Sequence, residues 1–129
     1  MPVEIHVLGL ALILQFVQFI LYSISANLQV GPKYAMSARD EQRQLTGLAG
    51  RLKRAMDNHF ESLIMFAIAV LVVTLGEGSN TVTQTCAHIY LGARILYVPA
   101  YAQGLAPWRS VIWMLGFGAI VVMTFAALF

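Results

Sequence analysis

Charged residues and cysteine are both scarce in this chain. Only 11% of its 129 residues are charged and 59% are hydrophobic, whereas soluble domains contain about 25% charged and about 45–50% apolar residues. The formal net charge of +2 is too small to indicate a nucleic-acid partner. Cys86 is the only cysteine, which excludes an internal disulfide and a multi-cysteine metal site, so we expect a buried thiol and no metal. The composition therefore indicates an integral membrane protein.

Long apolar runs fill nearly the whole chain. They cover approximately residues 5–28, 62–76, 82–103 and 107–129, and a membrane-spanning helix needs about 20 such residues. The second and third connections are short, which is typical of antiparallel neighbours in a bundle. We therefore expect an all-α, integral membrane, four-helix up-down bundle that occupies residues 1–129 as a single domain.

Basic residues predict the orientation of this bundle. The first connection and the residues just after it contain six of them: Lys33, Arg39, Arg43, Arg51, Lys53 and Arg54. Arg109 lies at the third connection, whereas the second, "GEGSN", contains no basic residue. The positive-inside rule then places connections one and three in the cytoplasm and both termini outside. The N-terminal "MPVEIHV" has neither a basic region nor a small-residue cleavage site, so we expect the first helix to remain as a span.

The segment "RAMDNHFES" opens the second apolar run with polar side chains. Asp57 and His59 are expected to point away from a face formed by four residues at spacings of 3, 4 and 3: Arg51, Arg54, Asn58 and Glu61. This face can bind a zwitterionic ligand, because Arg pairs with carboxylates and Glu accepts from an ammonium group. The alternative is that Arg54 and Glu61 stabilise the bundle while the basic cluster lies at lipid headgroups.

A second polar face lies in the third apolar run. Arg94, Tyr97 and Tyr101 are spaced 3 and 4 residues apart, which places them on one helix face. An intramembrane arginine usually faces the interior of a bundle or a wet cavity. The alternative is a buried ion pair between Arg94 and Glu61 that holds the second and third helices together.

The third polar feature is "APWRSV", residues 106–111. Pro107 is typical of a first helical turn, so Arg109 and Ser110 open the fourth helix. A helix N-terminus offers free N–H groups and favours anions, so a cation there is unfavourable unless an anion lies nearby. A thiolate is one candidate, because positive surroundings stabilise it. The alternative is an interfacial arginine that serves topology. All three features are expected at the same cytoplasmic end of the bundle.

These motifs resemble the family of membrane-associated proteins in eicosanoid and glutathione metabolism (MAPEG). The family includes microsomal glutathione transferases, leukotriene synthases, membrane prostaglandin E synthase and the five-lipoxygenase-activating protein. Its second helix opens with an arginine, an asparagine four residues on and a glutamate three further, and "RAMDNHFE" matches as Arg54, Asn58 and Glu61. "RILYVPAY" is similar to the third-helix pattern, and "APWRSV" to the start of the fourth helix in the prostaglandin synthase. The short loops and "SARDE" resemble the bacterial branch, which implies a bacterial inner membrane.

The resemblance implies a homotrimer that binds glutathione as a co-substrate between neighbouring subunits, on the cytoplasmic side. A lipophilic small-molecule electrophile then enters from the surrounding membrane lipids, and Arg109, with Ser110 as a second candidate, stabilises the thiolate that attacks it. Glutathione itself is held by seven residues: Arg51, Arg54, Asn58, Glu61, Arg94, Tyr97 and Tyr101. The implied activity is that of a glutathione transferase or peroxidase.

Two other functions remain open at this point. One is a non-catalytic trimer of the same family that binds and presents lipids. The other is a small multidrug transporter with four short helices, which requires a membrane-embedded carboxylate in the first helix. Glu4 lies at the outer end of that helix, which argues against the transporter.

Overall fold

The described part of the chain is helical, without strands. A computed structural model describes residues 1–38, 40 and 44–129. Its helices are α1 (Val3–Val30), α2 (Pro32–Met36), α3 (Gly47–Leu75), α4 (Thr81–Ala102) and α5 (Trp108–Leu128). Arg39 and Arg43, which contribute to the predicted basic connection, lie outside the described residues.

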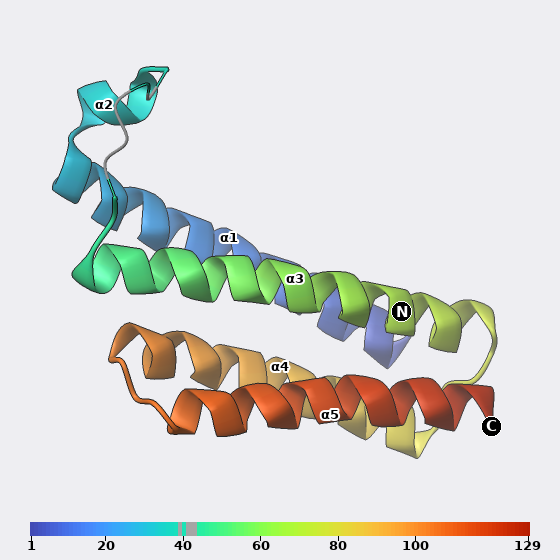
Figure 1. The fold of residues 1–129 in the computed structure, drawn as a ribbon. Helices are drawn as coiled ribbons and strands as arrows, with labels where there is room; N and C mark the ends of the chain where they lie inside the picture. Colours follow the sequence, from blue (N-terminus) through green and yellow to red (C-terminus); the bar gives the residue numbers. More distant parts are fainter. Residues whose placement is uncertain (39, 41–43) are drawn as a thin grey trace.

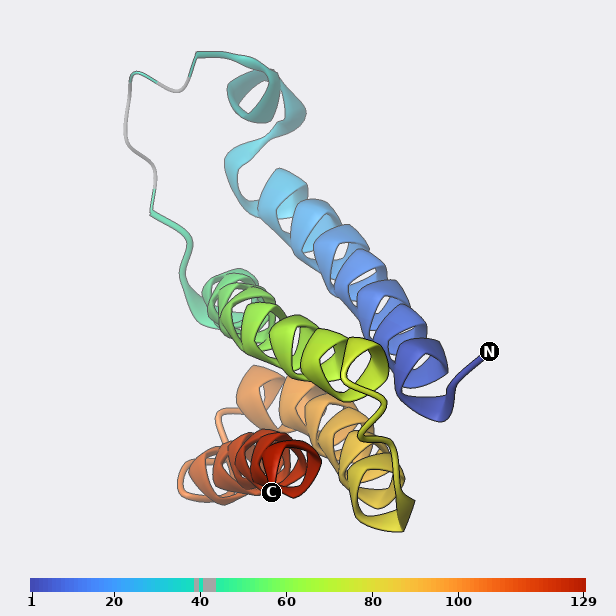
Figure 2. The same cartoon turned by 90° about the vertical axis from the view of Figure 1, so that its right-hand side faces the viewer.

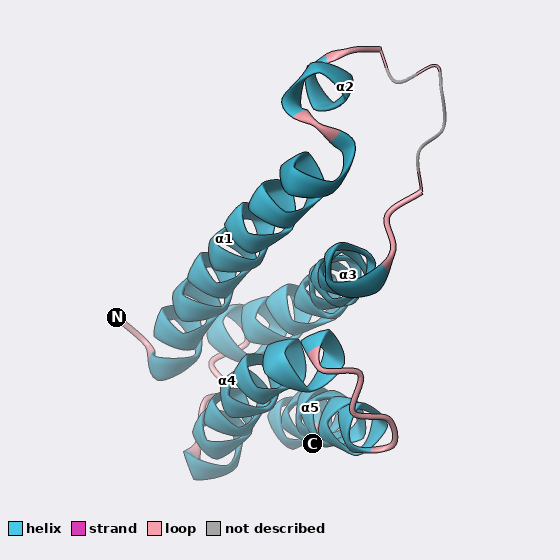
Figure 3. Cartoon of the chain, turned by 90° about the vertical axis from the view of Figure 1, so that its left-hand side faces the viewer, coloured by secondary structure: helices cyan, strands magenta, loops and turns pink. Residues whose placement is uncertain are grey.

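The four long helices alternate in direction along the bundle (Figure 1). Both termini and the α3–α4 turn lie at one end, whereas α2 and the α4–α5 connection lie at the other. Helix α1 packs on α3 and α4 but does not contact α5 within the described residues. Toward α2, helix α1 diverges from the α4–α5 pair, as Figures 2 and 3 show. The bundle is therefore more open at the α2 end.

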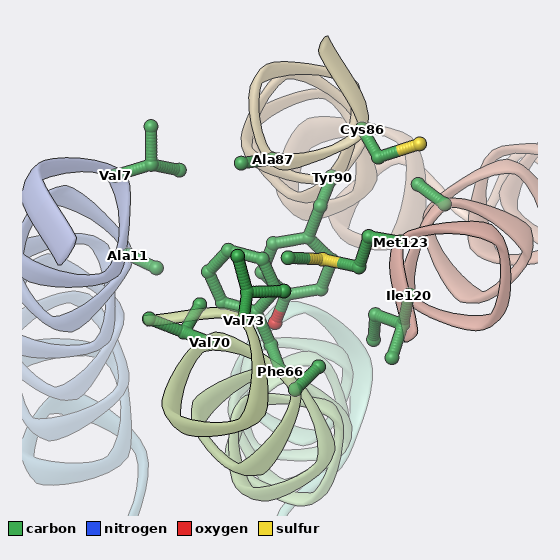
Figure 4. Packing of buried hydrophobic residues seen from close by; sticks show 12 residues of the cluster. Val7, Ala11, Phe66, Val70, Val73, Cys86, Ala87, Tyr90, Ile120 and Met123 are labelled. Atoms are coloured by element: carbon green, nitrogen blue, oxygen red, sulfur yellow. The ribbon is translucent and has the colours of Figure 1, made fainter. Parts of the chain in front are cut away.

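The apolar core includes Val7 near the start of α1 and Met123 near the end of α5, so it lies toward the end that holds the two termini; Figure 4 shows its packing. At its centre the rings of Phe66 and Tyr90 stack with centroids 4.0 Å apart. Four helices contribute the core residues: Val7, Ala11, Phe66, Ala69, Val70, Val73, Cys86, Ala87, Tyr90, Ala119, Ile120 and Met123. Cys86 is buried among them, as predicted from the sequence. The buried side chains of His59 and Arg94 lie in the opposite half of the bundle.

Three of the four predicted spans are supported by length and composition. Within the described residues, α1, α3 and α5 are long and apolar enough to cross a membrane, and α4 is not among them. Large hydrophobic side chains on α1 point away from the other helices; Phe16 and Phe19 are 54% and 57% exposed. Such a surface fits contact with lipid, since lipid tails are as apolar as these side chains.

The first connection is shorter than the sequence predicts. Helix α3 begins at Gly47, one turn before the Arg51 that opens the predicted polar face, and a short helix α2 opens with Pro32 at its first position, where proline is favoured. The Gln29 side chain joins the end of α1 to the start of α3, because its Oε1 accepts from the Thr46 N–H at 2.9 Å and its Nε2 donates to the Thr46 carbonyl at 3.0 Å.

The α4–α5 connection places the first turn of α5 beside the end of α4. Gly104 adopts a φ of +69°, which glycine accommodates without a Cβ clash. Its N–H donates to the Tyr101 carbonyl, and the Leu105 N–H donates to the Ala100 carbonyl, each at 2.9 Å. This pair of bonds is a Schellman motif, which satisfies the last carbonyls of α4. Pro107 precedes α5 as its N-cap, one position earlier than the first-turn position predicted.

Candidate functional site

A pocket of about 380 Å³ lies between α3, α4 and α5 in the polar half of the bundle. Its lining consists of Asn58, Tyr97, Arg109, Ser110, Trp113 and Met114. The first four are predicted site residues, one from α3, one from α4 and two from α5. Trp113 and Met114 were missed, although both follow Ser110 by about one helical turn and therefore share its side of α5. The structure thus brings together residues from all three predicted polar features.

Tyr101 lies between two arginines beside this pocket. The Nε of Arg54 donates to the Tyr101 hydroxyl at 3.1 Å, and its guanidinium carbon lies 5.8 Å from the centre of the tyrosine ring. The Arg109 guanidinium carbon lies 4.6 Å from the same centre. Both distances fall within the range of cation–π attraction. One tyrosine of α4 therefore positions an arginine of α3 and an arginine of α5.

Arg94 is buried next to the pocket wall, with only 2% of its surface exposed. Its Nη1 donates to Asn58 Oδ1 at 2.9 Å, and its guanidinium carbon lies 4.3 Å from the centre of the Tyr97 ring. The alternative of an Arg94–Glu61 ion pair is wrong. Arg94 reaches α3 about one turn before Glu61, and the Glu61 side chain is exposed and unpaired within the described residues.

His59 lies off the predicted polar face, on a neighbouring face of α3 that is buried. His59 is fully buried, and its ring contacts the Ala11 carbonyl of α1 at 3.0 Å and Arg94 Nε at 3.2 Å. The buried face of α3 is adjacent to the predicted polar face and follows spacings of 3 and 4 along the helix: Leu52, Ala55, His59, Ser62 and Phe66. This spacing is visible in the sequence and is the signal that identifies His59.

Asp57, by contrast, points away from the site as predicted. It is exposed and forms an ion pair with Lys53 at 2.8 Å, one helical turn earlier on α3. Arg51 points to the end of α4, where its Nε donates to the Ala102 carbonyl at 2.7 Å. Glu61 and Arg51 therefore do not line the pocket within one chain.

The first turn of α5 does not offer all the free N–H groups that the sequence suggests. The Arg109 N–H donates to the Leu105 carbonyl at 2.9 Å, and the Ser110 N–H donates to the Pro107 carbonyl at 3.0 Å. The backbone of the connection thus consumes these two donors. Any attraction for an anion at this point comes mainly from the Arg109 side chain.

Within residues 1–38, 40 and 44–129, the arginines near the pocket form no ion pair with a carboxylate. Arg109 lines the pocket, Arg94 bonds to Asn58 in its wall, and Arg54 contacts the same tyrosine as Arg109. In the part of the chain that the structure describes, the only ion pair is the one between Lys53 and Asp57. A buried or half-buried guanidinium without a counter-ion is electrostatically unfavourable, and an anion bound nearby relieves that cost. The pocket therefore suits an anionic ligand.

Comparison with known proteins identifies the family of the chain. A search of curated proteins found no match. The model of the MAPEG family matches residues 7–129, which include all of the helices that build the pocket. With its apolar helices, the protein is an integral membrane protein that belongs to the MAPEG family, a family concerned with glutathione or eicosanoid metabolism.

Proposed function

We propose that the protein is a membrane glutathione transferase or peroxidase that activates the glutathione thiolate for attack on lipophilic electrophiles. The observation that carries this proposal is the pocket where Asn58, Tyr97 and Arg109 meet, with Arg94 bonded to Asn58 and no carboxylate paired with either guanidinium in the described chain. Glutathione has two carboxylates and an ionisable thiol, so it supplies the negative charge that this pocket lacks.

The roles of individual residues follow from their positions. Arg109 lies at the pocket and binds the thiolate, with Ser110 as a second donor. Arg54, held by the Tyr101 hydroxyl, pairs with a carboxylate. Asn58 donates to an amide carbonyl of the peptide. Tyr97 and Tyr101 provide the aromatic wall on which Arg94 and Arg109 rest.

The reaction requires little beyond a stabilised anion and a close electrophile. The thiol proton passes to water, and the sulfur then forms a bond with the electrophilic carbon while the leaving group departs with its electron pair. Arg109 favours the thiolate, because a neighbouring cation stabilises the charged form of a thiol. Holding both reactants in one pocket converts a bimolecular step into an effectively unimolecular one.

A homotrimer accounts for the predicted residues that do not line the pocket of one chain. Glu61 is exposed and lies beside an unpartnered apolar stripe of α3, in which Phe60, Ile64 and Ile68 are 56%, 53% and 57% exposed. Packing this stripe against a second copy places Glu61 at a subunit interface, where it accepts from the glutamyl ammonium. In this proposal residues 1–129 form one four-helix transmembrane domain per subunit, and Arg51 approaches the same ligand.

The proposed orientation places the pocket at the cytoplasmic side of a bacterial inner membrane. Lys33, Arg51 and Lys53 lie at the same end of the bundle as the pocket, whereas both termini lie at the other end. The positive-inside rule then directs the pocket end to the cytoplasm and the termini outward.

Glutathione titration of the purified protein tests this function. We expect thiolate absorbance to rise on binding, and conjugation of 1-chloro-2,4-dinitrobenzene to follow. Arg109→Ala should abolish the thiolate signal, while Lys33→Ala, a change at an exposed basic residue on α2, should leave it intact. A folded wild-type protein with neither glutathione binding nor conjugation would refute the proposal.

A second pocket favours the alternative of a lipid-binding protein. It measures about 390 Å³, lies between α1, α2 and α3, and combines apolar α1 residues with Lys53 and Arg54. Such a lining suits an amphiphile with an anionic head. Saturable binding of a labelled fatty acid, together with no glutathione conjugation, would support this function over the enzyme.

A further inference from the structure

We infer that His59 is a positioning residue for the glutathione pocket, an inference that rests on the proposed function. It fixes the guanidinium of Arg94, which in turn fixes the side-chain amide of Asn58 at the pocket wall. The contacts run from α1 to the pocket: Ala11 carbonyl, His59 ring, Arg94 guanidinium and Asn58 amide. His59 itself does not line the pocket.

The direction of each hydrogen bond is fixed by its partners. The Ala11 carbonyl can only accept, so the His59 Nε2 at 3.0 Å must carry the hydrogen. The Nε of Arg94 can only donate, so the His59 Nδ1 at 3.2 Å must be unprotonated. His59 is therefore neutral and held as the Nε2–H tautomer, which presents an acceptor to α4.

The same logic orients Asn58. Its Oδ1 accepts from Arg94 Nη1 at 2.9 Å, so the two N–H bonds of its Nδ2 remain for other partners. Because Asn58 also lines the pocket, these donors are available to a ligand carbonyl or carboxylate there. Reversing the amide would place its donors against a guanidinium, which has no acceptor.

Arg94 holds this orientation only if its own guanidinium is fixed. The Nε of Arg94 donates to His59 and its Nη1 donates to Asn58. The Tyr97 ring packs against the face of the guanidinium, whereas Nη2 is buried without a partner in the described chain. Without the His59 acceptor, Arg94 has two buried nitrogens that lack partners. A buried donor that loses its partner is strongly unfavourable, so the guanidinium reorients and releases Asn58.

Three substitutions at His59 separate positioning from folding. Asn keeps an acceptor at the δ position for Arg94, Gln keeps a donor at the ε position for Ala11, and Leu keeps neither. We expect His59→Leu and His59→Gln to raise the KM for glutathione about tenfold with kcat changed less than about twofold, a loss typical of one hydrogen bond to a ligand. We expect His59→Asn to recover most of the affinity.

The matched control is His88→Leu, because His88 is exposed on α4 and, in the described chain, its ring forms a hydrogen bond with the Gln84 carbonyl of its own helix. Its kinetics should equal those of wild type. A wild-type KM for glutathione in His59→Leu would overturn the assignment. So would a wild-type KM in His59→Gln together with a raised KM in His59→Asn. Thermal unfolding midpoints of the Asn and Gln variants, measured in parallel, exclude a difference in folding as the cause.

Nuclear magnetic resonance provides a readout that needs no glutathione. The chain has three histidines, so the ¹⁵N ring signals of His59 are assigned by their loss in His59→Asn, and they should show the Nε2–H tautomer. The side-chain amide signal of Asn58 should shift in His59→Leu and return toward wild type in His59→Asn. If the side-chain amide signal of Asn58 stays at its wild-type position in both variants, the inference is refuted. If these shifts occur but glutathione does not bind, the proposed function fails and the positioning of Asn58 stands.

Discussion

The guanidinium carbon of Arg109 lies 4.6 Å from the centre of the Tyr101 ring. The same tyrosine accepts a hydrogen bond from Arg54 through its hydroxyl, at 3.1 Å. These two interactions use different parts of one side chain, the face of the ring and its oxygen. Substitutions at Tyr101 can therefore separate the contribution of Arg54 from that of Arg109.

Tyr101→Phe should weaken glutathione binding without abolishing the thiolate. The variant loses the oxygen that holds Arg54, at a cost of about 1 kcal/mol or roughly fivefold in affinity, but it keeps the ring beneath Arg109. Tyr101→Leu removes both and should also reduce the thiolate absorbance at saturating glutathione. Titration of both variants with glutathione checks this difference in thiolate absorbance. An equal thiolate signal in Tyr101→Phe and Tyr101→Leu would contradict the role given to the ring.

Asp57→Asn should have almost no effect, although Asp57 immediately precedes Asn58. The Lys53–Asp57 pair is exposed, with side chains 48% and 51% accessible, and pairs of this kind contribute about 0.3–0.5 kcal/mol. Unfolding in mixed detergent micelles should show a change below about 0.5 kcal/mol, with unchanged glutathione affinity. A loss of affinity comparable to that of Asn58→Ala would mean that the wrong face of α3 has been assigned.

Gly116 lies where α5 approaches α4 beside Arg94. A Cβ at this position would lie 3.5 Å from Ala93 Cβ and 3.9 Å from Arg94 Cδ, which is ordinary contact. Gly116→Ala should therefore fold normally and stabilise the helix by about 0.5–1 kcal/mol. Gly116→Leu should overfill the site, cost about 1–3 kcal/mol and displace Arg94, which a raised KM for glutathione would report. Destabilisation by Ala would show that the α4–α5 packing is tighter than described.

Glu4 joins the start of α1 to the α3–α4 turn. The side chain is buried, and its Oε1 accepts from Ser79 Oγ at 2.7 Å and from Thr83 Oγ1 at 2.8 Å. Glu4→Leu removes the acceptor of the Ser79 hydroxyl, whereas Thr83 Oγ1 still has the Asn80 carbonyl at 2.9 Å, and the variant should lower the free energy of unfolding by about 1–3 kcal/mol. Glu4→Gln keeps an acceptor oxygen and should cost less. Equal losses in the two variants, measured by detergent unfolding, would contradict this account.

Helical spacing predicted much of the polar half of the molecule. Asn58, Tyr97 and Arg109 were identified from three short motifs on three helices, and they line one pocket. Periodicity succeeds here because it reports which residues share a face of one helix. It does not report which face meets which neighbour, so the sequence places His59 off the polar face but does not show that it is buried against α1 and bonded to Arg94.

Other features depend on contacts that no periodicity contains. Arg94 is bound by Asn58 and His59 rather than by Glu61, because the relative translation of α3 and α4 decides which turn the guanidinium reaches. The polar first turns of α3 are helical, as the predicted face requires, and Leu52 and Ala55 bury one side of these turns. The trimer and the glutathione chemistry stay predictions.

The separation of the apolar core from the polar pocket has a consequence for how this protein can evolve. The bond between Ser62 and the Tyr90 hydroxyl, at 3.0 Å, marks the boundary between the two halves. Improved activity is often gained at the expense of stability when one set of side chains serves both. Here the two tasks occupy opposite ends of the same helices, so substrate range can diversify at Trp113 and Met114 while the folded scaffold is inherited unchanged.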